Sequence, residues 1–214
     1  MSTRTHNRLT KPPLSRNLIN HRKGACECQS NAYDVVPPFD LDVDQPARPL
    51  ALGACAVYVG TCSWADPNFV KEGAFYPRSV RNDPERRLRY YANVFPTVEV
   101  DATYHALQPA ERAAKWVQWT PEGFIFNAKA FALFTWHETD PRRLPPEIQR
   151  LLPPSRAAAE SVGADGLPEE VLHAIWGYYA AFIDAFARTG RLGHVLFQFP
   201  KGRGYTPELF AHLD

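Results

Sequence analysis

The chain has 214 residues, of which 45% are hydrophobic, 13% aromatic and 22% charged. This length suits one large domain or two small ones, at about 100–200 residues per domain. Its 24 Lys and Arg against 23 Asp and Glu leave a formal net charge of +1, which gives no general argument for nucleic acid or an acidic membrane as partner. No run approaches the roughly 18 consecutive apolar residues of a membrane span, and no apolar stretch near the start resembles a secretory signal. We therefore expect a soluble protein.

The four cysteines, Cys26, Cys28, Cys55 and Cys62, lie in the first third of the chain and form no C-x-x-C pair. Zinc binding by Cys26, Cys28 and His21 would lack a fourth ligand, and the spacing fits no standard zinc knuckle. The sequence favours free thiols in a reducing compartment, so we expect cytoplasmic localisation.

Charge separates an N-terminal segment from the rest of the chain. Residues 1–26 carry six basic residues and no acid, whereas residues 27–45 carry five acids and no Lys or Arg. With several prolines and no apolar periodicity, residues 1–56 are predicted to be a disordered, low-order tail. An acid-free, Arg-rich start also resembles an organellar transit peptide. A solvated tail and an upstream extension that is not part of the natural product are the other interpretations.

From residue 57 onward, turn signals separate a series of regular elements. The sequence predicts a buried strand over 57–59, a helix capped by Asp83 with a buried face ending at Phe95, and a strand over 97–101. A helix over 109–119 and a strand over 124–129 follow, and the Pro-rich stretch 130–167 holds one expected short helix near 147–152. A long helix opened by Pro168 and closed by Gly190, a strand over 194–199 and a helix starting at Pro207 complete the order. Four aromatic residues at helical spacing are expected in the core: Trp116, Trp119, Trp176 and Tyr179.

This strand–helix alternation predicts the α/β class with a parallel sheet. The order corresponds to about half of a (β/α)8 barrel, which takes roughly 250 residues. Residues 57–214 are therefore either an open α/β sheet or an incomplete TIM-barrel-like domain. The stop at Asp214, a few residues into a new helix, favours a partial (β/α)8 TIM-type barrel of about four parallel strands.

Polar side chains follow one face of three predicted strands. Glu99 and Asp101 are two residues apart on one strand, so both side chains leave the same face. Asn127 and Lys129 share a face of the next strand, and Gln198 lies on the last. In a barrel these groups would meet at the carboxyl ends of the strands, where barrel enzymes keep their sites. Such a set can transfer protons or hold a divalent cation through oxygen ligands. The alternative is that the groups pair with one another and merely fill the barrel interior.

Loop residues beside this edge are further candidates for substrate binding. Trp64 follows the first strand, and Thr103 and Tyr104 follow the second. Tyr104 can stack on a ring or donate through its hydroxyl, and a packed tyrosine is the alternative. The 130–167 stretch has the length of a lid or substrate-binding loop and contains His137, although a lone loop histidine is more often neither ligand nor catalyst.

Several familiar motifs are absent from the sequence. It contains no P-loop, no G-x-G-x-x-G after a strand, no G-x-S-x-G elbow and no H-E-x-x-H motif. The basic turn over 201–204 is short, and phosphate binding there is the less favoured interpretation.

Several blocks nevertheless occur in an order found in a known family: V-G-T-C-S-W at 59–64, F-Y-P at 75–77, F-P-T-V-E-V-D-A-T-Y at 95–104, T-P-E-G-F at 120–124 and L-F-Q-F-P at 196–200. Over most of 57–205 the chain thus resembles the domain of unknown function 72 (YecE-like) family, whereas residues 1–56 have no counterpart in it. The resemblance implies a TIM-type barrel, bacterial and cytoplasmic in most members, with no firmly assigned activity. Family members continue through further strands, which supports a truncated barrel, and Asp101 replaces the family's usual asparagine. The resemblance also implies a pocket built from Glu99, Asp101, Thr103, Tyr104, Lys129 and Gln198.

Three functional hypotheses follow. The first is a barrel enzyme acting on a small polar or phosphorylated, sugar-like substrate, with Glu99 or Asp101 as general base and Lys129 stabilising negative charge. Tyr104 and Gln198 would orient the substrate. The second is a non-catalytic ligand- or protein-binding barrel, and the third an inactive fragment. A small molecule is the expected partner, whereas nucleic acid and membrane are not expected. The sequence leaves the cofactor open, with a divalent metal as one candidate. The sequence leaves the oligomeric state open.

Overall fold

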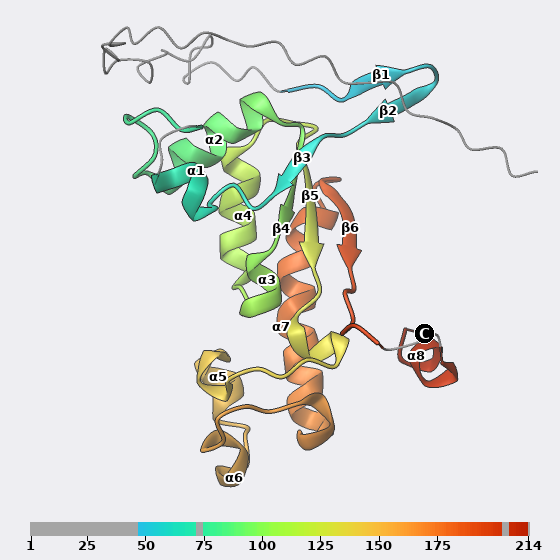
Figure 1. Cartoon of the computed structure of the whole chain (residues 1–214). Coiled ribbons are helices and arrows are strands. Elements are labelled where there is room, and N and C mark those ends of the chain that lie inside the picture. The colour runs from blue at the N-terminus through green and yellow to red at the C-terminus, as the bar shows by residue number, and fades with distance from the viewer. Residues whose placement is uncertain (1–46, 72–74, 203–205, 214) are drawn as a thin grey trace, which may run out of the picture. The chain divides into compact units, whose positions relative to one another are not determined.

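The computed structural model describes residues 47–71, 75–202 and 206–213 (Figure 1). It begins with an antiparallel hairpin of two strands, β1 (Leu50–Leu52) and β2 (Cys55–Val57). A four-stranded parallel sheet follows, composed of β3 (Gly60–Cys62), β4 (Thr97–Val100), β5 (Ile125–Lys129) and β6 (Leu192–Leu196). The strands are hydrogen-bonded in the order β3-β4-β5-β6, so that order in the sheet follows order in the chain.

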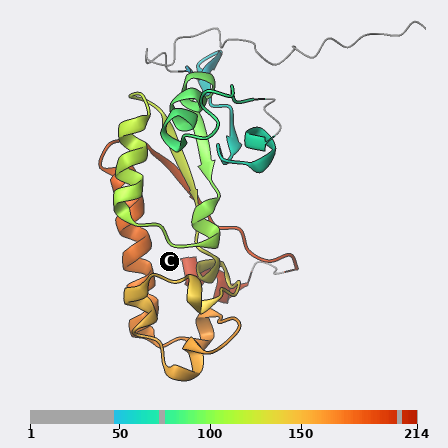
Figure 2. The same cartoon turned by 90° about the vertical axis from the view of Figure 1, so that its left-hand side faces the viewer.

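Helices occupy every connection between the parallel strands. The connections contain α1 (Pro67–Lys71) and α2 (Pro84–Val94), then α3 (Ala102–His105) and α4 (Ala110–Trp119), then α5 (Pro146–Gln149), α6 (Pro154–Ala157) and α7 (Glu169–Ala187), with α8 (Pro207–Leu213) after β6. Figure 2 shows α4 and α7 along one side of the sheet. Sequential parallel strands joined by helices confirm the predicted α/β class and the arrangement of a partial (β/α)8-type fold. None of the described helices has the length and apolar character needed to cross a membrane.

The helix α2 begins where the sequence predicts and ties β3 to β4. The Asp83 carboxylate accepts hydrogen bonds from two backbone N–H groups of the first turn, and Pro84 occupies the first helical position. On the buried face of α2, the Tyr91 hydroxyl accepts from the backbone N–H of Thr61 at 2.8 Å and donates to the Thr97 carbonyl at 3.1 Å. A single phenol therefore bridges the backbones of the first two parallel strands.

Gly60 allows these two strands to approach closely. A Cβ atom at this position would lie 2.2 Å from the carbonyl oxygen of Thr97, far inside van der Waals contact. The constraint comes from the neighbouring backbone, which cannot rotate away as a side chain could. Glycine is thus a steric requirement of the pairing between β3 and β4.

The main core lies between the sheet and its helices. Val98 and Val100 of β4 and Phe126 of β5 are buried against Phe182 and Phe186 of α7. The rings of Phe126 and Phe186 stack with centroids 4.4 Å apart. This packing confirms that the valine face of β4 meets the helices, so the alternate residue, Glu99, faces the other side of the sheet.

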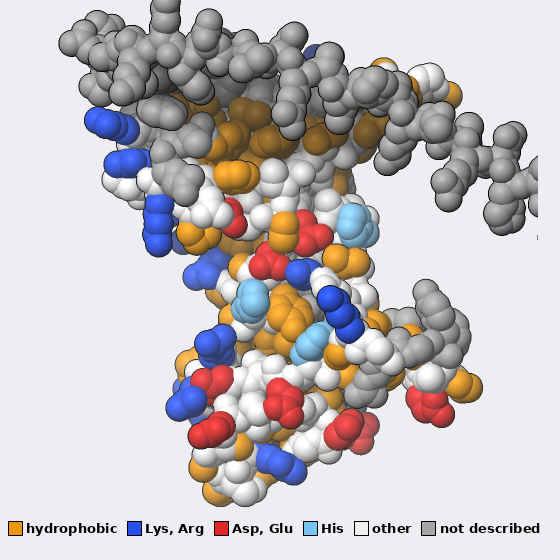
Figure 3. Space-filling view, in the orientation of Figure 1, with side chains coloured by type: hydrophobic (Ala, Val, Ile, Leu, Met, Phe, Trp, Pro, Cys, Tyr) orange, Lys and Arg blue, Asp and Glu red, His pale blue; other side chains and the backbone are white. Residues whose placement is uncertain are grey.

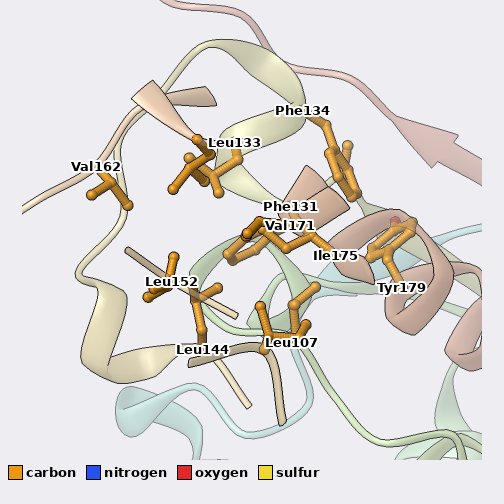
Figure 4. Packing of buried hydrophobic residues seen from close by; sticks show 13 residues of the cluster. Leu107, Phe131, Leu133, Phe134, Leu144, Leu152, Val162, Val171, Ile175 and Tyr179 are labelled. Carbon is orange, nitrogen blue, oxygen red and sulfur yellow. The ribbon is translucent and has the colours of Figure 1, made fainter. Parts of the chain in front are cut away.

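The Pro-rich stretch 130–167 is more structured than the sequence predicts. Besides α5 and α6 it forms three 3-10 turns: η1 (Ala132–Thr135), η2 (Pro141–Arg143) and η3 (Ala164–Gly166). Proline opens several of these elements because its fixed φ suits a first helical position. Figure 4 shows how Phe131, Leu144, Leu152 and Val162 from this stretch pack on the first half of α7 around Ile175. The stretch is therefore a packed cap with its own apolar cluster.

Several sequence-based boundaries differ from the structure. The strand expected over 57–59 is displaced: β2 ends at Val57 and β3 begins at Gly60. Residues 47–56, predicted to belong to the low-order tail, contribute to the hairpin, whose turn uses Gly53 at φ +61°. Residues 1–46 lie outside the described part of the chain. Trp176, expected in the core, is 39% exposed and stacks on Phe134 at the outer side of α7.

Candidate functional site

Chemically reactive side chains gather where β3, β4 and β5 end, on the sheet face opposite α4 and α7. Strand register places Cys62 of β3 beside Glu99 of β4, and Asp101 and Lys129 follow at the ends of β4 and β5. Figure 3 shows acidic, basic and histidine side chains together on this face. We call Cys62, Glu99, Asp101 and Lys129 the strand-end cluster. The structure therefore brings the three catalytic candidates to one place, while their roles stay predictions.

The closest charged contact in the cluster joins Lys129 Nζ to Asp101 Oδ1 at 2.8 Å. The two side chains are 18% and 28% exposed, so water screens the pair only in part. Burial favours the neutral form of Asp101, but the hydrogen bond and charge of Lys129 outweigh it and hold the pKa of Asp101 below its usual range. The hydrogen bond to Asp101 raises the pKa of Lys129 against the opposing effect of burial. At neutral pH the pair is a carboxylate and an ammonium, and neither is near its titration.

Glu99 has a different partner. The Cys62 thiol donates to Glu99 Oε1 with a sulfur–oxygen distance of 3.1 Å. Partial burial of the thiol, this hydrogen bond and the negative charge of Asp101 raise the pKa of Cys62 to about 12. Cys62 is thus a neutral thiol at physiological pH and a poor nucleophile, because the thiolate is the reactive form. Glu99 accepts this weak S–H hydrogen bond and is partly open to solvent.

Two hydroxyl groups hold the backbone of Lys129. Thr103 Oγ1 of α3 lies 2.7 Å from the carbonyl oxygens of both Val100 and Lys129, so its single proton is shared between the ends of β4 and β5. Tyr179 Oη of α7 donates to the Lys129 oxygen at 3.0 Å, which fixes the point from which the lysine side chain departs. Thr103, predicted to bind substrate, is itself buried, so in this structure it positions Lys129.

Aromatic and imidazole rings border the cluster on the side of the cap. Lys129 Nζ lies 5.6 Å from the centroid of the Tyr104 ring. The rings of His137 and Tyr104 meet with centroids 5.3 Å apart, and His137 Nδ1 lies 2.9 Å from Thr135 Oγ1. His105, one turn after Asp101 on α3, places Nε2 at 3.4 Å from Asp101 Oδ2. Tyr104 and His137 thus lie at the border of the cluster, and substrate binding by them stays a prediction.

Other predicted residues lie outside this group of contacts. Trp64 is buried with its ring edge-to-face on Trp116 at 4.7 Å, which makes it part of the core. Gln198 is exposed two residues beyond β6. Asn127 lies on the predicted face but donates to Thr97 Oγ1 at 2.9 Å, and it therefore serves the pairing of β4 and β5. Substrate binding by Trp64 or Gln198 stays a prediction.

A divalent cation would find three donor atoms in the cluster. One ligand atom from each of Cys62, Glu99 and Asp101 lies within 4.8 Å of the others. Two properties of the same residues oppose metal binding: Lys129 already neutralises Asp101, and a thiol with a pKa of about 12 gives up its proton reluctantly. At neutral pH a metal ion would therefore compete with Lys129 for Asp101 and with a proton for Cys62.

Two residues of this region, Cys62 and His105, are not among the site residues predicted from the sequence. The sequence indicates only a free thiol at Cys62. It predicts the first strand over 57–59, before Cys62, and so gives no sign that this residue pairs with Glu99 in the sheet. His105 lies four residues after Asp101 in a four-residue helix that the sequence does not predict. The i to i+4 spacing is the signal that could have found it.

Comparisons with known proteins agree on one family. The family described as "Protein of unknown function DUF72" matches residues 58–214. The UPF0759 protein YunF of Bacillus subtilis (strain 168) is 26% identical over 157 residues, which is 73% of this chain and 44% of that protein. Two crystal structures of a DUF72 family protein from Enterococcus faecalis V583 are similar to this chain, at 22% and 24% sequence identity and TM-scores of 0.42. Each match covers 73% of this chain and 44% of the Enterococcus faecalis chain. The chain spans less than half the length of the relatives it matches.

Proposed function

Because the chain belongs to the DUF72 family, whose description assigns no function, we propose its activity from the geometry of the strand-end cluster. The proposal is an enzyme that binds a small polar or phosphorylated, sugar-like substrate and moves a proton with a carboxylate. The observation that carries it is the position of the Lys129 ammonium, paired with Asp101 at 2.8 Å and placed at the same strand ends as Glu99. A cationic group and a proton acceptor are thereby offered to one ligand.

The cluster divides the roles among its residues. The ammonium of Lys129 has three N–H donors, and the bond to Asp101 uses one, so donors are left for an anionic oxygen of the substrate. Asp101 holds Lys129 in position and, with its lowered pKa, is a weak base. We assign the role of general base to Glu99, which accepts the weaker S–H hydrogen bond of Cys62. For a carbonyl sugar phosphate, Glu99 would take a proton from the carbon beside the carbonyl, and the electron pair of that C–H bond would form an enolate whose oxygen charge Lys129 stabilises.

The ligand itself would extend toward the cap. The Tyr104 ring beside Lys129 offers an apolar face to a sugar ring, and its neighbour His137 offers a hydrogen bond from the cap. Because the cap packs on α7 through its own apolar cluster, His137 has a firm support, and Tyr104 is held on α3.

The binding half of the proposal is tested by thermal shift with fructose 6-phosphate, fructose and inorganic phosphate. We expect fructose 6-phosphate to raise the melting temperature of the whole chain, and Lys129→Ala to abolish that rise. Lys115→Ala, which removes an exposed lysine of α4, is the matched control and should leave the rise intact. Stabilisation that survives Lys129→Ala would contradict the assignment of the anion to this ammonium.

The catalytic half is tested by proton NMR in deuterium oxide. We expect the wild-type chain to exchange the C–H hydrogen beside the carbonyl of fructose 6-phosphate, and Glu99→Gln to lose exchange while it keeps the thermal shift. Exchange that persists in Glu99→Gln would refute the role of this residue.

A second function, ligand binding without catalysis, is favoured by the same ion pair. The pKa of Asp101 is lowered and that of Lys129 is raised, so both pKa values lie far from neutral pH. Groups that keep their charge in this way suit a fixed anion site better than proton transfer. A thermal shift that depends on Lys129, with no exchange in the wild-type chain, would select this alternative. An inactive fragment would show neither.

A further inference from the structure

The cap contains a pocket that the function proposed above does not use. It has a volume of about 400 Å³ and is lined by Trp136, Glu138, Gly163, Ala164 and Asp165. This volume lies within the roughly 300–1,000 Å³ that is usual for small-molecule pockets. All five lining residues belong to the cap, and none of them belongs to the strand-end cluster. We call this place the cap pocket.

The two segments that line the cap pocket are fixed to each other by hydrogen bonds. Thr139, next to Glu138, and Val162, next to Gly163, pair as an antiparallel bridge with N–H to carbonyl distances of 3.0 and 2.9 Å. Both of these side chains are buried. The Ser161 hydroxyl also donates to the side chain of Glu138, which ties one lining residue to the opposite segment. The pocket is therefore formed before any ligand arrives, which lowers the entropic cost of binding.

The lining of the cap pocket has the chemistry of a cation site. Glu138 and Asp165 contribute acidic side chains from the two segments, and the described lining residues include no Lys, Arg or His. Trp136 contributes an indole, the aromatic ring that attracts cations most strongly. An ammonium group on a short hydrocarbon stem matches both features, because its N–H groups donate to carboxyl oxygens and its stem packs against a ring.

One basic side chain lies close by without lining the pocket. The guanidinium of Arg156 packs against the turn that follows Asp165, where a Cβ added at Gly166 would meet Arg156 Cζ at 3.0 Å. A phosphate or carboxylate ligand would still meet two acidic side chains in the pocket itself, which disfavours anions. A neutral sugar or alcohol would leave those two acidic side chains without a countercharge.

We propose that the cap pocket binds a small organic amine in its ammonium form. The ammonium group lies between the side chains of Glu138 and Asp165, and the hydrocarbon stem lies against Trp136. This inference concerns a site separate from the strand-end cluster, so it stands whether or not the cluster has the activity proposed above.

The test is isothermal titration calorimetry of the full chain with cadaverine, in which a hydrocarbon stem joins two ammonium groups, at constant ionic strength. We expect cadaverine to bind and 1,5-pentanediol, its neutral counterpart, not to bind. Glu138→Gln and Asp165→Asn each remove an acidic group with little change of shape and should weaken binding about fivefold. Glu160→Gln removes an exposed acidic side chain of the cap that does not line the pocket, so it is the matched control and should bind like the wild type.

Tryptophan fluorescence provides a second measurement of the same event. Cadaverine should change the emission of the wild-type chain, and Trp136→Phe should lose this change. Trp176→Phe removes an exposed indole that does not line the pocket and should keep the change. Circular dichroism should show unchanged helix content in every variant.

Three results would overturn the proposal. Absence of cadaverine binding to the wild-type chain would exclude an amine site, and equal binding of 1,5-pentanediol would show that the positive charge is not recognised. A loss of affinity in Glu160→Gln as large as in Glu138→Gln and Asp165→Asn would reveal diffuse attraction to an acidic surface instead of binding in the cap pocket.

Discussion

The ion pair between Asp101 and Lys129 should contribute measurably to the free energy of unfolding. Asp101→Asn and Lys129→Met each remove one charge, and Asp101 makes no side-chain capping bond to α3, so helix capping does not confuse the result. Exposed pairs contribute about 0.2–1 kcal/mol, whereas breaking a fully buried pair costs about 3–5 kcal/mol. With side chains 28% and 18% exposed, this pair falls between those limits. We expect a coupling free energy of about 1–2 kcal/mol from a double-mutant cycle.

The pH dependence of this coupling follows from the direction of each pKa shift. The pKa of Asp101 lies below its ordinary value of 3.8 in the folded chain, so its contribution is present above that pH and is lost as pH falls through the folded pKa. The pKa of Lys129 lies above its ordinary value of 10.5, so its contribution is present below that pH and is lost as pH rises through the folded pKa. The coupling should therefore be constant from about pH 5 to about pH 9 and decline outside that window.

Urea unfolding of the wild type, both single variants and the double variant at about pH 7 measures the coupling, and a series down to about pH 3 follows its decline. The pair Glu85–Arg89, one turn apart on α2 and 42% and 35% exposed, is the matched control and should give about 0.3–0.5 kcal/mol. A coupling at Asp101–Lys129 no larger than in the control would refute the reasoning from burial. So would a coupling that stays unchanged below the folded pKa of Asp101.

Three further predictions concern the strands around the cluster. Tyr91→Phe should lower the free energy of unfolding, measured with urea, by about 2–4 kcal/mol, because backbone groups of two strands lose their hydrogen bonds to the hydroxyl. A decrease under about 1 kcal/mol would contradict the bridging role. Gly60→Ala should prevent cooperative unfolding or lower the stability of the chain severely. In α7 a Cβ at Gly177 would meet nothing within 4 Å, so Gly177→Ala should raise the free energy of unfolding by about 0.5–1 kcal/mol. Similar effects at both positions would be inconsistent with the close approach of β3 and β4. Because its pKa is raised to about 12, Cys62 should react slowly with iodoacetamide near neutral pH, as followed by peptide mass spectrometry. Glu99→Gln should accelerate this reaction, because it removes the carboxylate that helps to raise the pKa of the thiol. An unchanged rate would argue against the hydrogen bond between the thiol and the carboxylate.

The elements with strong local signals were predictable from the sequence. Asp83 before Pro84 locates the start of α2, and the alternation around Glu99 assigns the two faces of β4 correctly. These signals are local: a cap acts within one turn, and alternation follows from the geometry of one strand. The same alternation, applied to two neighbouring parallel strands, is enough to predict that Glu99, Asp101 and Lys129 meet at one edge of the sheet.

The remaining features depend on contacts between distant residues. The hairpin Leu50–Val57 is exposed on both strands and so lacks the apolar alternation that marks a half-buried strand. Without that signal the first parallel strand is predicted too early in the chain, which conceals the register of Cys62 with Glu99. Trp64 lies after a strand, as a substrate-binding residue would, and only the position of Trp116 on α4 shows that it turns into the core.

Tyr179 has contacts at two places on the molecule. Its ring lines a hollow of about 560 Å³ on the outer side of α7, while its hydroxyl donates to the backbone oxygen of Lys129 at the end of β5. A rigid phenol thus spans the layer between an outer helix surface and the residue that carries the ammonium. A tilt of α7 against the sheet would therefore move the backbone oxygen beside which the lysine side chain departs.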